Sequence, residues 1–507
     1  MEGDPRAVYQ DRIQRFRDER TEVGERIGRT RRSRLVLFFL LVVFFLVGEW
    51  TAGLLARSFF VAGVLATVGF VFLVVRHRRL RDEEARLEVR VDLNEEALAR
   101  CERRWEGLPA ALPAPDTGDH PYADDLDMVG PTSVERLLST VSTGPGARTL
   151  RSWLLAPASS GEIRARQEAV EELSHRIEFR QELAARARVA GLGRTDLTES
   201  FLAWAEEESW LDPRRPLLWT ARAVPVLTLL LFLFQVAGWL DGYWWLLGPL
   251  VGLFFLGIWT EPIGEVIDRI SAGQRFIGAY GDPLELLEEL EPGSERMGRV
   301  RDLARSGEGS ASRALRSLER WITTADVRYN HLIHVPLQVT LFWDVHVLRA
   351  LEKWRDRNGA SVASWLQAVG EAEALAALAA LRADNPEWCF PDLAESGAGG
   401  DSEAGTPGDS DSRLRSRMPE VRVRARGLGH PLIPPERSVV NDAEVGPPGT
   451  FLLVTGSNMS GKSTLLRSIG ANCVLGLAGG PVCAAEFRLP RVRVLTSMRT
   501  EDSLARG

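Results

Sequence analysis

The chain has 507 residues, of which 45% are hydrophobic, and this length allows two to four domains. Its 62 Lys and Arg residues against 69 Asp and Glu residues give a formal net charge of −7. The overall charge therefore does not indicate a nucleic-acid-binding protein, and any contact with DNA has to come from a local basic patch. The four cysteines are scattered without a C-x-x-C pair, so they indicate neither a disulfide scaffold nor a metal site. A reducing, cytoplasmic setting for the soluble parts is consistent with them.

Two apolar runs near the N-terminus predict a transmembrane helical hairpin over residues 35–75, after a charged, Arg-rich segment at 1–34. With flanking residues each run is about 18 residues long, at the short end of what a membrane-crossing helix needs. Arginines before the first run and after the second place both ends in the cytoplasm. A hairpin buried in a soluble core is the alternative, but core helices are rarely apolar on every face.

Residues 76–125 are predicted to form a charged amphipathic helix followed by a proline-containing linker, and residues 126–216 to form a helical domain. Apolar residues recur at helical spacing in three stretches of this domain. They are Leu137, Leu138 and Val141; Leu150, Trp153 and Leu154; and Ile163, Val170, Leu173 and Ile177.

A second transmembrane hairpin is predicted over 217–260, with apolar runs at 223–240 and 243–260. Aromatic residues cluster where the two runs join, as in an interfacial aromatic belt. A buried soluble hairpin is again the alternative. Four crossings would keep the C-terminal part of the chain on the same side of the membrane as the Arg-rich N-terminus.

Residues 261–394 are predicted to continue the helical domain. His331, His334 and His346 lie in this segment, but no acidic residue or cysteine completes a metal-ligand set at the right spacing, so core or solvated histidines are expected. Residues 395–413 are rich in Gly, Ser and Asp and predict a disordered linker. Residues 421–426 alternate as a strand with one basic face, either solvated or facing DNA.

The strongest motif lies near the C-terminus, where an apolar run at 451–455 predicts a buried strand, and a G-x-x-x-x-G-K-[ST] sequence follows it before a helix from Leu465. This is the context of a phosphate-binding P-loop. Its glycines let backbone N–H groups surround phosphate oxygens. Lys462 would reach the β- and γ-phosphates, and Ser463 would ligate Mg²⁺. The predicted nucleotide-binding residues are Gly456, Ser457, Asn458, Met459, Ser460, Gly461, Lys462, Ser463 and Thr464.

The neighbouring residues are informative about the family. His430-Pro431, Asn441-Asp442, the loop with its Asn458-Met459 pair, and the segment 496–507 follow one another in the order typical of MutS. The chain thus resembles the ATPase domain of the MutS family of DNA mismatch repair proteins. Residues 142–157, followed by Arg166-Gln167, resemble the MutS core (lever) domain. The two similarities cover about 130–180 and 428–507. Ser457 and Ser460 depart from the usual Pro and Gly of the loop, and the adenine-stacking aromatic is replaced around Ser438-Val439.

The resemblance implies a multi-domain protein: a mainly α lever with two transmembrane hairpins, and an incomplete C-terminal α/β P-loop (ABC-type) domain at 414–507. It implies ATP and Mg²⁺ as cofactors, DNA as a partner, and a homodimer formed through the ATPase domain. We expect ATP-dependent DNA binding, with DNA damage or mismatch sensing in repair, at the inner (cytoplasmic) membrane with the ATPase domain in the cytoplasm.

Two expected parts of MutS are missing from the sequence. No Phe-x-Glu mismatch-reading wedge is present, and no apolar strand ends in the Asp-Glu of a Walker B motif. We therefore expect a truncated reading frame without catalytic residues of its own and without ATP turnover alone. Two alternatives remain open: a membrane transport or remodelling ATPase, and an ATP-binding membrane scaffold that does not bind DNA.

Overall fold

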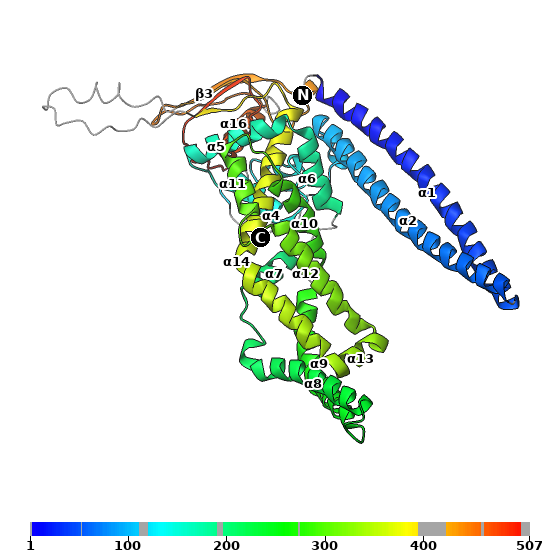
Figure 1. The fold of residues 1–507 in the computed structure, drawn as a ribbon. Coiled ribbons are helices and arrows are strands. Elements are labelled where there is room, and N and C mark those ends of the chain that lie inside the picture. Colours follow the sequence, from blue (N-terminus) through cyan, green and yellow to red (C-terminus); the bar gives the residue numbers. More distant parts are fainter. Residues whose placement is uncertain are drawn as a thin grey trace, which may run out of the picture. The chain divides into compact units, whose positions relative to one another are not determined.

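The computed structural model describes residues 3–51, 53–110, 120–189, 196–271, 274–393, 422–457 and 461–497. The chain divides into two compact units, Met1–Pro109 with Ala383–Asn385, and Ala110–Arg382 with Pro386–Gly507. Most described residues are helical, and one small sheet completes the fold (Figure 1). The mainly helical part of the predicted fold class is confirmed, whereas the α/β P-loop domain stays a prediction.

The first unit is a long hairpin of α1 (Pro5–Trp50) and α2 (Leu54–Cys101), shown in blue in Figure 1. Its base is held by an apolar seam of Ile13, Phe16, Val23, Ile27, Leu80, Leu87 and Val91. Ion pairs flank the seam, with Arg17 2.5 Å from Glu95 and Arg20 3.1 Å from Glu88. The charged segments before and after residues 35–75 therefore belong to the same two helices. They pack against each other at the base of the hairpin.

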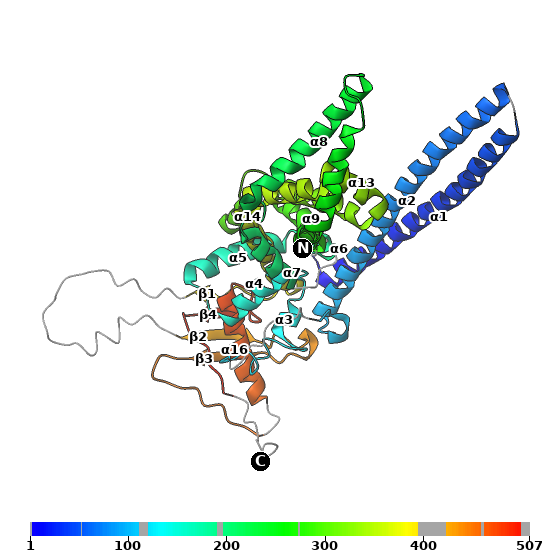
Figure 2. The same cartoon turned by 90° about the horizontal axis from the view of Figure 1, so that it is seen from below.

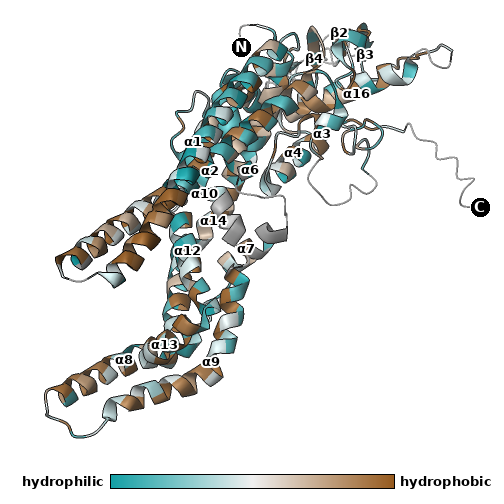
Figure 3. Cartoon of the chain, turned by 90° about the vertical axis from the view of Figure 1, so that its right-hand side faces the viewer, coloured by the Kyte–Doolittle hydropathy of each residue, from teal (hydrophilic) through white to brown (hydrophobic). Residues whose placement is uncertain are grey.

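The other end of this hairpin is apolar and exposed, as the brown ends of α1 and α2 in Figure 3 show. A Cβ atom on Gly69 would lie 3.1 Å from the Leu37 side chain, and one on Gly63 would lie 3.3 Å from Phe45. Small residues thus let the two helices approach each other. The most apolar window of α1 is 0% buried and that of the second helix 11%. The alternative of a hairpin buried in a soluble core is therefore wrong for this hairpin.

The second unit has a body of helices, and serine or threonine hydroxyls cap α3, α4, α5, α11 and α12 by accepting a backbone N–H in the first turn. Its shorter helices are α3 (Val134–Leu137), α4 (Gly144–Leu155), α5 (Ser160–Ser174), α6 (Ile177–Val189), α7 (Asp196–Glu206), α10 (Gln274–Glu288), α11 (Glu295–Ala304) and α12 (Ala311–Ala325). The long α14 (Trp343–Asp384) runs through the body, and its alanine-rich stretch at 371–381 is buried.

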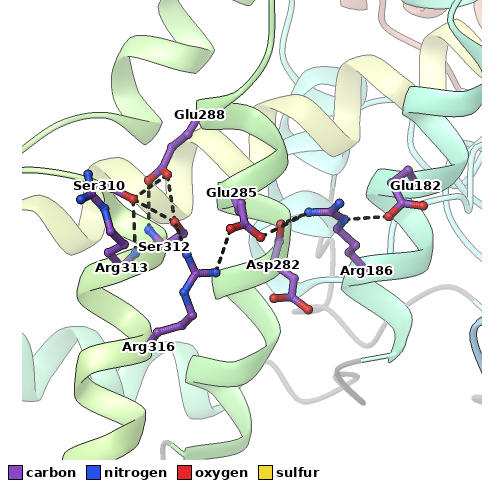
Figure 4. A network of polar contacts seen from close by, with 9 residues as sticks. All are labelled: Glu182, Arg186, Asp282, Glu285, Glu288, Ser310, Ser312, Arg313 and Arg316. Carbon is purple, nitrogen blue, oxygen red and sulfur yellow. Dashed lines mark hydrogen bonds and ion pairs between the residues drawn. The ribbon is translucent and has the colours of Figure 1, made fainter. Parts of the chain in front are cut away.

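Polar contacts link three of these helices (Figure 4). Glu288 of α10 accepts hydrogen bonds from Ser310 and from the hydroxyl and backbone of Ser312 at the start of α12. Arg316 of α12 lies 3.1 Å from Glu285 of α10. Arg186 of α6 donates to the carbonyl of Asp282. These contacts fix α10 between α6 and α12.

Three further helices of the second unit are apolar and largely exposed: α8 (Arg215–Val236), α9 (Leu247–Ser271) and α13 (His331–Leu341). The helices at Asp212–Val236 and Trp244–Ile270 are long and apolar enough to cross a membrane, as are those of the first unit. Only 11% and 17% of their most apolar windows are buried, so the alternative of a buried soluble hairpin is wrong here too.

The sheet has four strands in the order β1-β4-β2-β3. They are β1 (Asp392–Leu393), β2 (Val423–Leu428), β3 (Asn441–Val445) and β4 (Glu486–Leu489). β1 is parallel to β4, whereas β2 is antiparallel to both of its neighbours. The predicted strand with a basic face is found as β2, with Ala425 buried, Arg424 exposed, and Arg426 paired with Glu486 at 3.3 Å.

The predicted buried strand at 451–455 is wrong. These residues form no strand, and Phe451 is 85% exposed. A strand needs hydrogen-bonding neighbours, and none of the four strands in the described sheet pairs with this segment. The helix expected from Leu465 is present as α16 (Lys462–Ala478) and begins three residues earlier. The linker predicted at 395–413 lies outside the described residues.

Candidate nucleotide-binding site

The predicted phosphate-binding loop ends at the N-terminus of α16. Gly461 caps this helix with φ +82°, a left-handed conformation that a glycine adopts without strain. Of the predicted loop residues, the structure describes Gly456, Ser457 and Gly461 to Thr464, while Asn458, Met459 and Ser460 lie outside the described residues. The chain therefore turns into the helix where the motif requires a glycine.

Lys462 spans the loop. Its Nζ donates to the carbonyl oxygens of Gly456, at 2.5 Å, and Ser457, at 2.6 Å. The ammonium group is thereby held beside the backbone of residues 456 and 457. The side chains of Ser463 and Thr464 are exposed in the same turn.

This arrangement suits an anion. The first N–H groups of a helix have no partners within the helix, and among the described residues no side-chain cap bond is found at the N-terminus of α16. The helix dipole adds a partial positive charge there, and Lys462 adds a full one. The described residues of the loop thus fit a phosphate group.

Asn472, in the middle of α16, joins two of the segments that carry the family resemblance. Its side chain is fully buried. The Nδ2 atom donates to the Gly429 carbonyl at 3.0 Å, and Oδ1 accepts the backbone N–H of Cys483 at 2.6 Å. Gly429 also donates to the Cys483 carbonyl. The residues before His430 and those at 481–484 are therefore held against the helix behind the loop.

The His-Pro and Asn-Asp pairs have structural partners. His430 is buried, and its Nδ1 accepts the N–H of Leu432 at 3.2 Å. Burial lowers the pKa of His430 to about 4, so the ring is neutral at physiological pH. Asp442 accepts the N–H of Gly427 at 2.8 Å and so fixes the end of β2 against β3.

Arg166 connects α5 to the C-terminal end of α16. Its Nη1 donates to the Ala478 carbonyl at 3.1 Å, and its guanidinium carbon lies 3.9 Å from the centre of the Trp153 ring. A Cβ atom on Gly479 would lie 2.5 Å from that of Arg166, so the two segments are in close contact. The two stretches that resemble MutS are therefore packed together. Sequence patterns singled out Trp153 and Arg166 but gave no indication of their partner.

A second contact of this kind lies near the loop. Arg467 of α16 donates to Asp127 at 3.1 Å, and a Cβ atom on Gly470 would meet the Leu126 side chain at 2.7 Å. The segment before α3 thus packs along the N-terminal half of α16. Sequence analysis did not find these residues, because a single Asp–Arg pair 340 positions apart leaves no local pattern.

Comparison with known proteins finds no family model that matches the chain. It does find similarity to DNA mismatch repair proteins called MutS. The chain is 37% identical over 100 residues to MutS of Halalkalibacterium halodurans, which is 18% of this chain and 12% of that protein. It is 30% identical over 163 residues to MutS of Granulibacter bethesdensis, 32% of this chain and 15% of that protein.

A third similarity, 35% over 91 residues, is to MutS of Thermotoga petrophila, with 17% of this chain and 12% of that protein covered. The chain thus spans 12 to 15% of the length of the curated relatives it matches. These partial similarities support a relationship to the MutS proteins of DNA mismatch repair.

Proposed function

We propose that this chain is a MutS-like ATP-binding protein that binds DNA in a repair process and is anchored in a membrane. The observation that carries the proposal is the position of Lys462. It lies across a glycine loop at the start of α16, and the other end of this helix is held by Arg166 from the segment that resembles the MutS lever. The partial similarity to MutS supports the same function.

ATP with Mg²⁺ is the ligand that fits these residues. The N–H groups at the start of α16 would hold phosphate oxygens. Lys462 would exchange its two carbonyl partners for phosphate, and the exposed Ser463 hydroxyl would contribute to Mg²⁺ binding. When bound, Mg²⁺ neutralises part of the triphosphate charge.

DNA binding and a homodimer formed through the nucleotide-binding part are proposed from the relatives. The exposed basic face of β2 is one local surface with suitable charge, although Glu444 pairs with Arg422 and Glu486 pairs with Arg426. Because the net charge of the chain is −7, such a local surface has to provide the phosphate contacts.

Membrane anchoring is proposed from the exposed apolar helices. Four of them are long and apolar enough to cross a bilayer. Arginines flank the first pair, and this charge pattern favours an inner-membrane protein with its nucleotide-binding part in the cytoplasm.

The proposal is tested by measuring DNA affinity of the full chain in lipid nanodiscs against salt concentration, with and without ATP. We expect affinity to fall at least about tenfold between roughly 50 and 200 mM salt, as several phosphate contacts require. ATP should change this affinity in the parent and in Lys353→Ala, but not in Lys462→Ala. Failure to bind DNA at low salt would contradict the proposal and favour a transport or remodelling ATPase, or a scaffold.

A further inference from the structure

The buried face of α13 is polar, and its large apolar side chains are exposed. His331 at its start and Thr340 near its end are also exposed, and the Thr340 hydroxyl donates to the Pro336 carbonyl at 2.7 Å. His334 and Gln338, four residues apart on one face, are buried, and Gln338 is 0% exposed. The large apolar side chains of the helix point outward, and Leu332 is 89% exposed. Ile333, Val335 and Leu341 are also exposed. A helix on a water-soluble surface has the opposite arrangement.

The buried polar groups of α13 are satisfied by one another and by neighbouring helices. The Nε2 atom of His334 lies 2.9 Å from Asp344 Oδ1, and the backbone N–H of Asp344 donates to Gln338 Oε1 at 2.9 Å. The amide of Gln338 reaches Thr260 of α9 at 3.4 Å. Burying polar groups is costly unless they pair, and this network gives the buried side chains of His334 and Gln338 their partners.

Helix α13 packs alongside α9, next to the apolar run at 243–260. Just before α13, Arg328 donates to the Gly264 carbonyl at 2.8 Å, beyond the end of the apolar run. Near the C-terminal end of α13, the Val339 backbone lies close to Gly252 of α9. A Cβ atom on Gly252 would be 1.9 Å from the Val339 carbonyl oxygen. Gly252 and Gly264 are twelve residues apart on α9, so the two contacts lie about 18 Å apart along its axis. Figures 1 and 2 both show α13 beside α9.

The chain then turns back within the apolar region. Phe342 has φ +53° and ends α13, and α14 starts at the next residue. The Phe342 ring packs edge-on against Phe255 of α9, with centroids 4.9 Å apart. From residue 329 to residue 343 the sequence has no Asp, Glu, Lys or Arg. Charged residue types are costly in hydrocarbon, and Asp344, the first one after the turn, is buried against His334.

We propose that α13 is a re-entrant helix that dips into the bilayer beside α9 and turns back at Phe342, with lipid acyl chains covering its outer face. This inference rests on the proposed membrane insertion of α8 and α9. Lipid is the occupant that the structure favours, because the exposed face of α13 continues the exposed apolar surface of α9. That face consists mainly of large apolar side chains, and the exposed Thr340 hydroxyl is bonded to the Pro336 carbonyl of the same helix.

Spin labels on single cysteines test the proposal in the full chain in nanodiscs, with the four native cysteines replaced by alanine. Leu332→Cys and Leu341→Cys probe α13. Phe254→Cys, on the exposed side of α9, reports on the proposed hairpin, and Glu319→Cys, exposed on α12, is the aqueous control. We expect the labels on α13 and at position 254 to be more accessible to oxygen than to a water-soluble nickel chelate, and the label at 319 to show the reverse.

The outcomes separate the two proposals. If position 254 is in lipid while 332 and 341 resemble 319, the re-entrant helix is refuted and the membrane hairpin stands. If 254 itself is reached by the nickel chelate, the hairpin is refuted and the re-entrant helix with it. Shielding of 332 and 341 from both reagents would show a protein partner, such as a second copy, in place of lipid.

A second measurement needs no substitution. Phospholipids with a photoreactive group in the acyl chain are irradiated with the unmodified chain, and the labelled peptides are mapped by mass spectrometry. We expect label in the peptides of both α9 and α13. Label in α9 with none in 331–341 would overturn the inference even if the cysteine variants do not fold.

Discussion

The guanidinium of Arg166 donates to the carbonyl of Ala478 at 3.1 Å, 312 residues further along the chain. The carbonyls at the end of a helix have no partner within it, so a buried cation there satisfies one of them and interacts favourably with the helix dipole. The Trp153 ring lies against the same guanidinium, with its centre 3.9 Å from the guanidinium carbon. One arginine thus joins α4, α5 and the helix that follows the proposed phosphate loop.

Replacing Arg166 should weaken this junction. Arg166→Ala removes the hydrogen bond to Ala478, the contact with Glu162 and the stacking on Trp153, and should lower the free energy of unfolding by about 2 kcal/mol. Arg166→Lys keeps the charge but not the planar stacking, and should recover only part of the loss. Thermal unfolding followed by tryptophan fluorescence measures both. Arg148→Ala, at an exposed position on α4, is the control and should have little effect.

Asn472 should be needed to hold the residues at 481–484 against α16. Asn472→Ala leaves the Cys483 N–H and the Gly429 carbonyl without their side-chain partner, at a cost of about 2–4 kcal/mol. Hydrogen exchange should therefore become faster in the peptide that contains Cys483. Asn358→Ala, where one local hydrogen bond is lost, is the control. Unchanged protection of Cys483 in Asn472→Ala would contradict this account of the junction.

Glu373 should make stability depend on pH. Its carboxylate is buried and accepts hydrogen bonds from the backbone of Ser142 and the hydroxyl of Thr143, and burial raises its pKa from 4.5 to about 7. The folded protein therefore keeps the proton over a pH range in which the unfolded chain has lost it. The resulting stabilisation is fully present below about pH 4.5 and is lost as the pH rises through about 7, up to about 3 kcal/mol.

Melting temperatures of the parent and Glu373→Gln at several pH values test this. The parent should lose more stability between about pH 5 and pH 8 than the variant, because glutamine does not titrate. Glu168→Gln, exposed on α5, should follow the parent. Parallel curves for the parent and Glu373→Gln would rule out Glu373 as the titrating group.

The proposed topology predicts where reporter domains should be found. Fusions after Trp50 and after Gly242, at the turns of the two hairpins, should report the outside, and a fusion after Arg81 should report the cytoplasm. Protease protection in sealed vesicles provides an independent reading. Release of the chain from membranes without detergent would contradict the topology.

The sequence predicted the local elements well where periodicity and capping decide them. The three predicted helical stretches lie mainly on α3, α4 and α5, but Leu138 and Val141 follow the end of α3 and Ile177 begins α6. The two apolar hairpins are present. A helix is fixed largely by contacts between residues close in sequence, so its pattern is visible without the fold. The segment 451–455 has the composition of a strand but no neighbour to pair with, and composition alone does not supply one.

Long-range contacts were not predictable in the same way. The bond from Arg166 to Ala478 and the two bonds of Asn472 to Gly429 and Cys483 depend on which segments meet, and one sequence does not show this. Helix α13 was missed as a membrane element for another reason. At 11 residues it is too short for a hydropathy criterion, and its polar residues become informative only once their burial is known.

Lysine acylation provides the most direct test of nucleotide binding, because the chain contains only two lysines, Lys462 and the exposed Lys353. The full chain in nanodiscs is treated with an amine-reactive reagent with and without Mg-ATP, and acylation of each lysine is measured by mass spectrometry. Mg-ATP should protect Lys462 at least about tenfold at saturation and leave Lys353 unchanged. Equal acylation of Lys462 with and without saturating Mg-ATP would contradict the proposed nucleotide site.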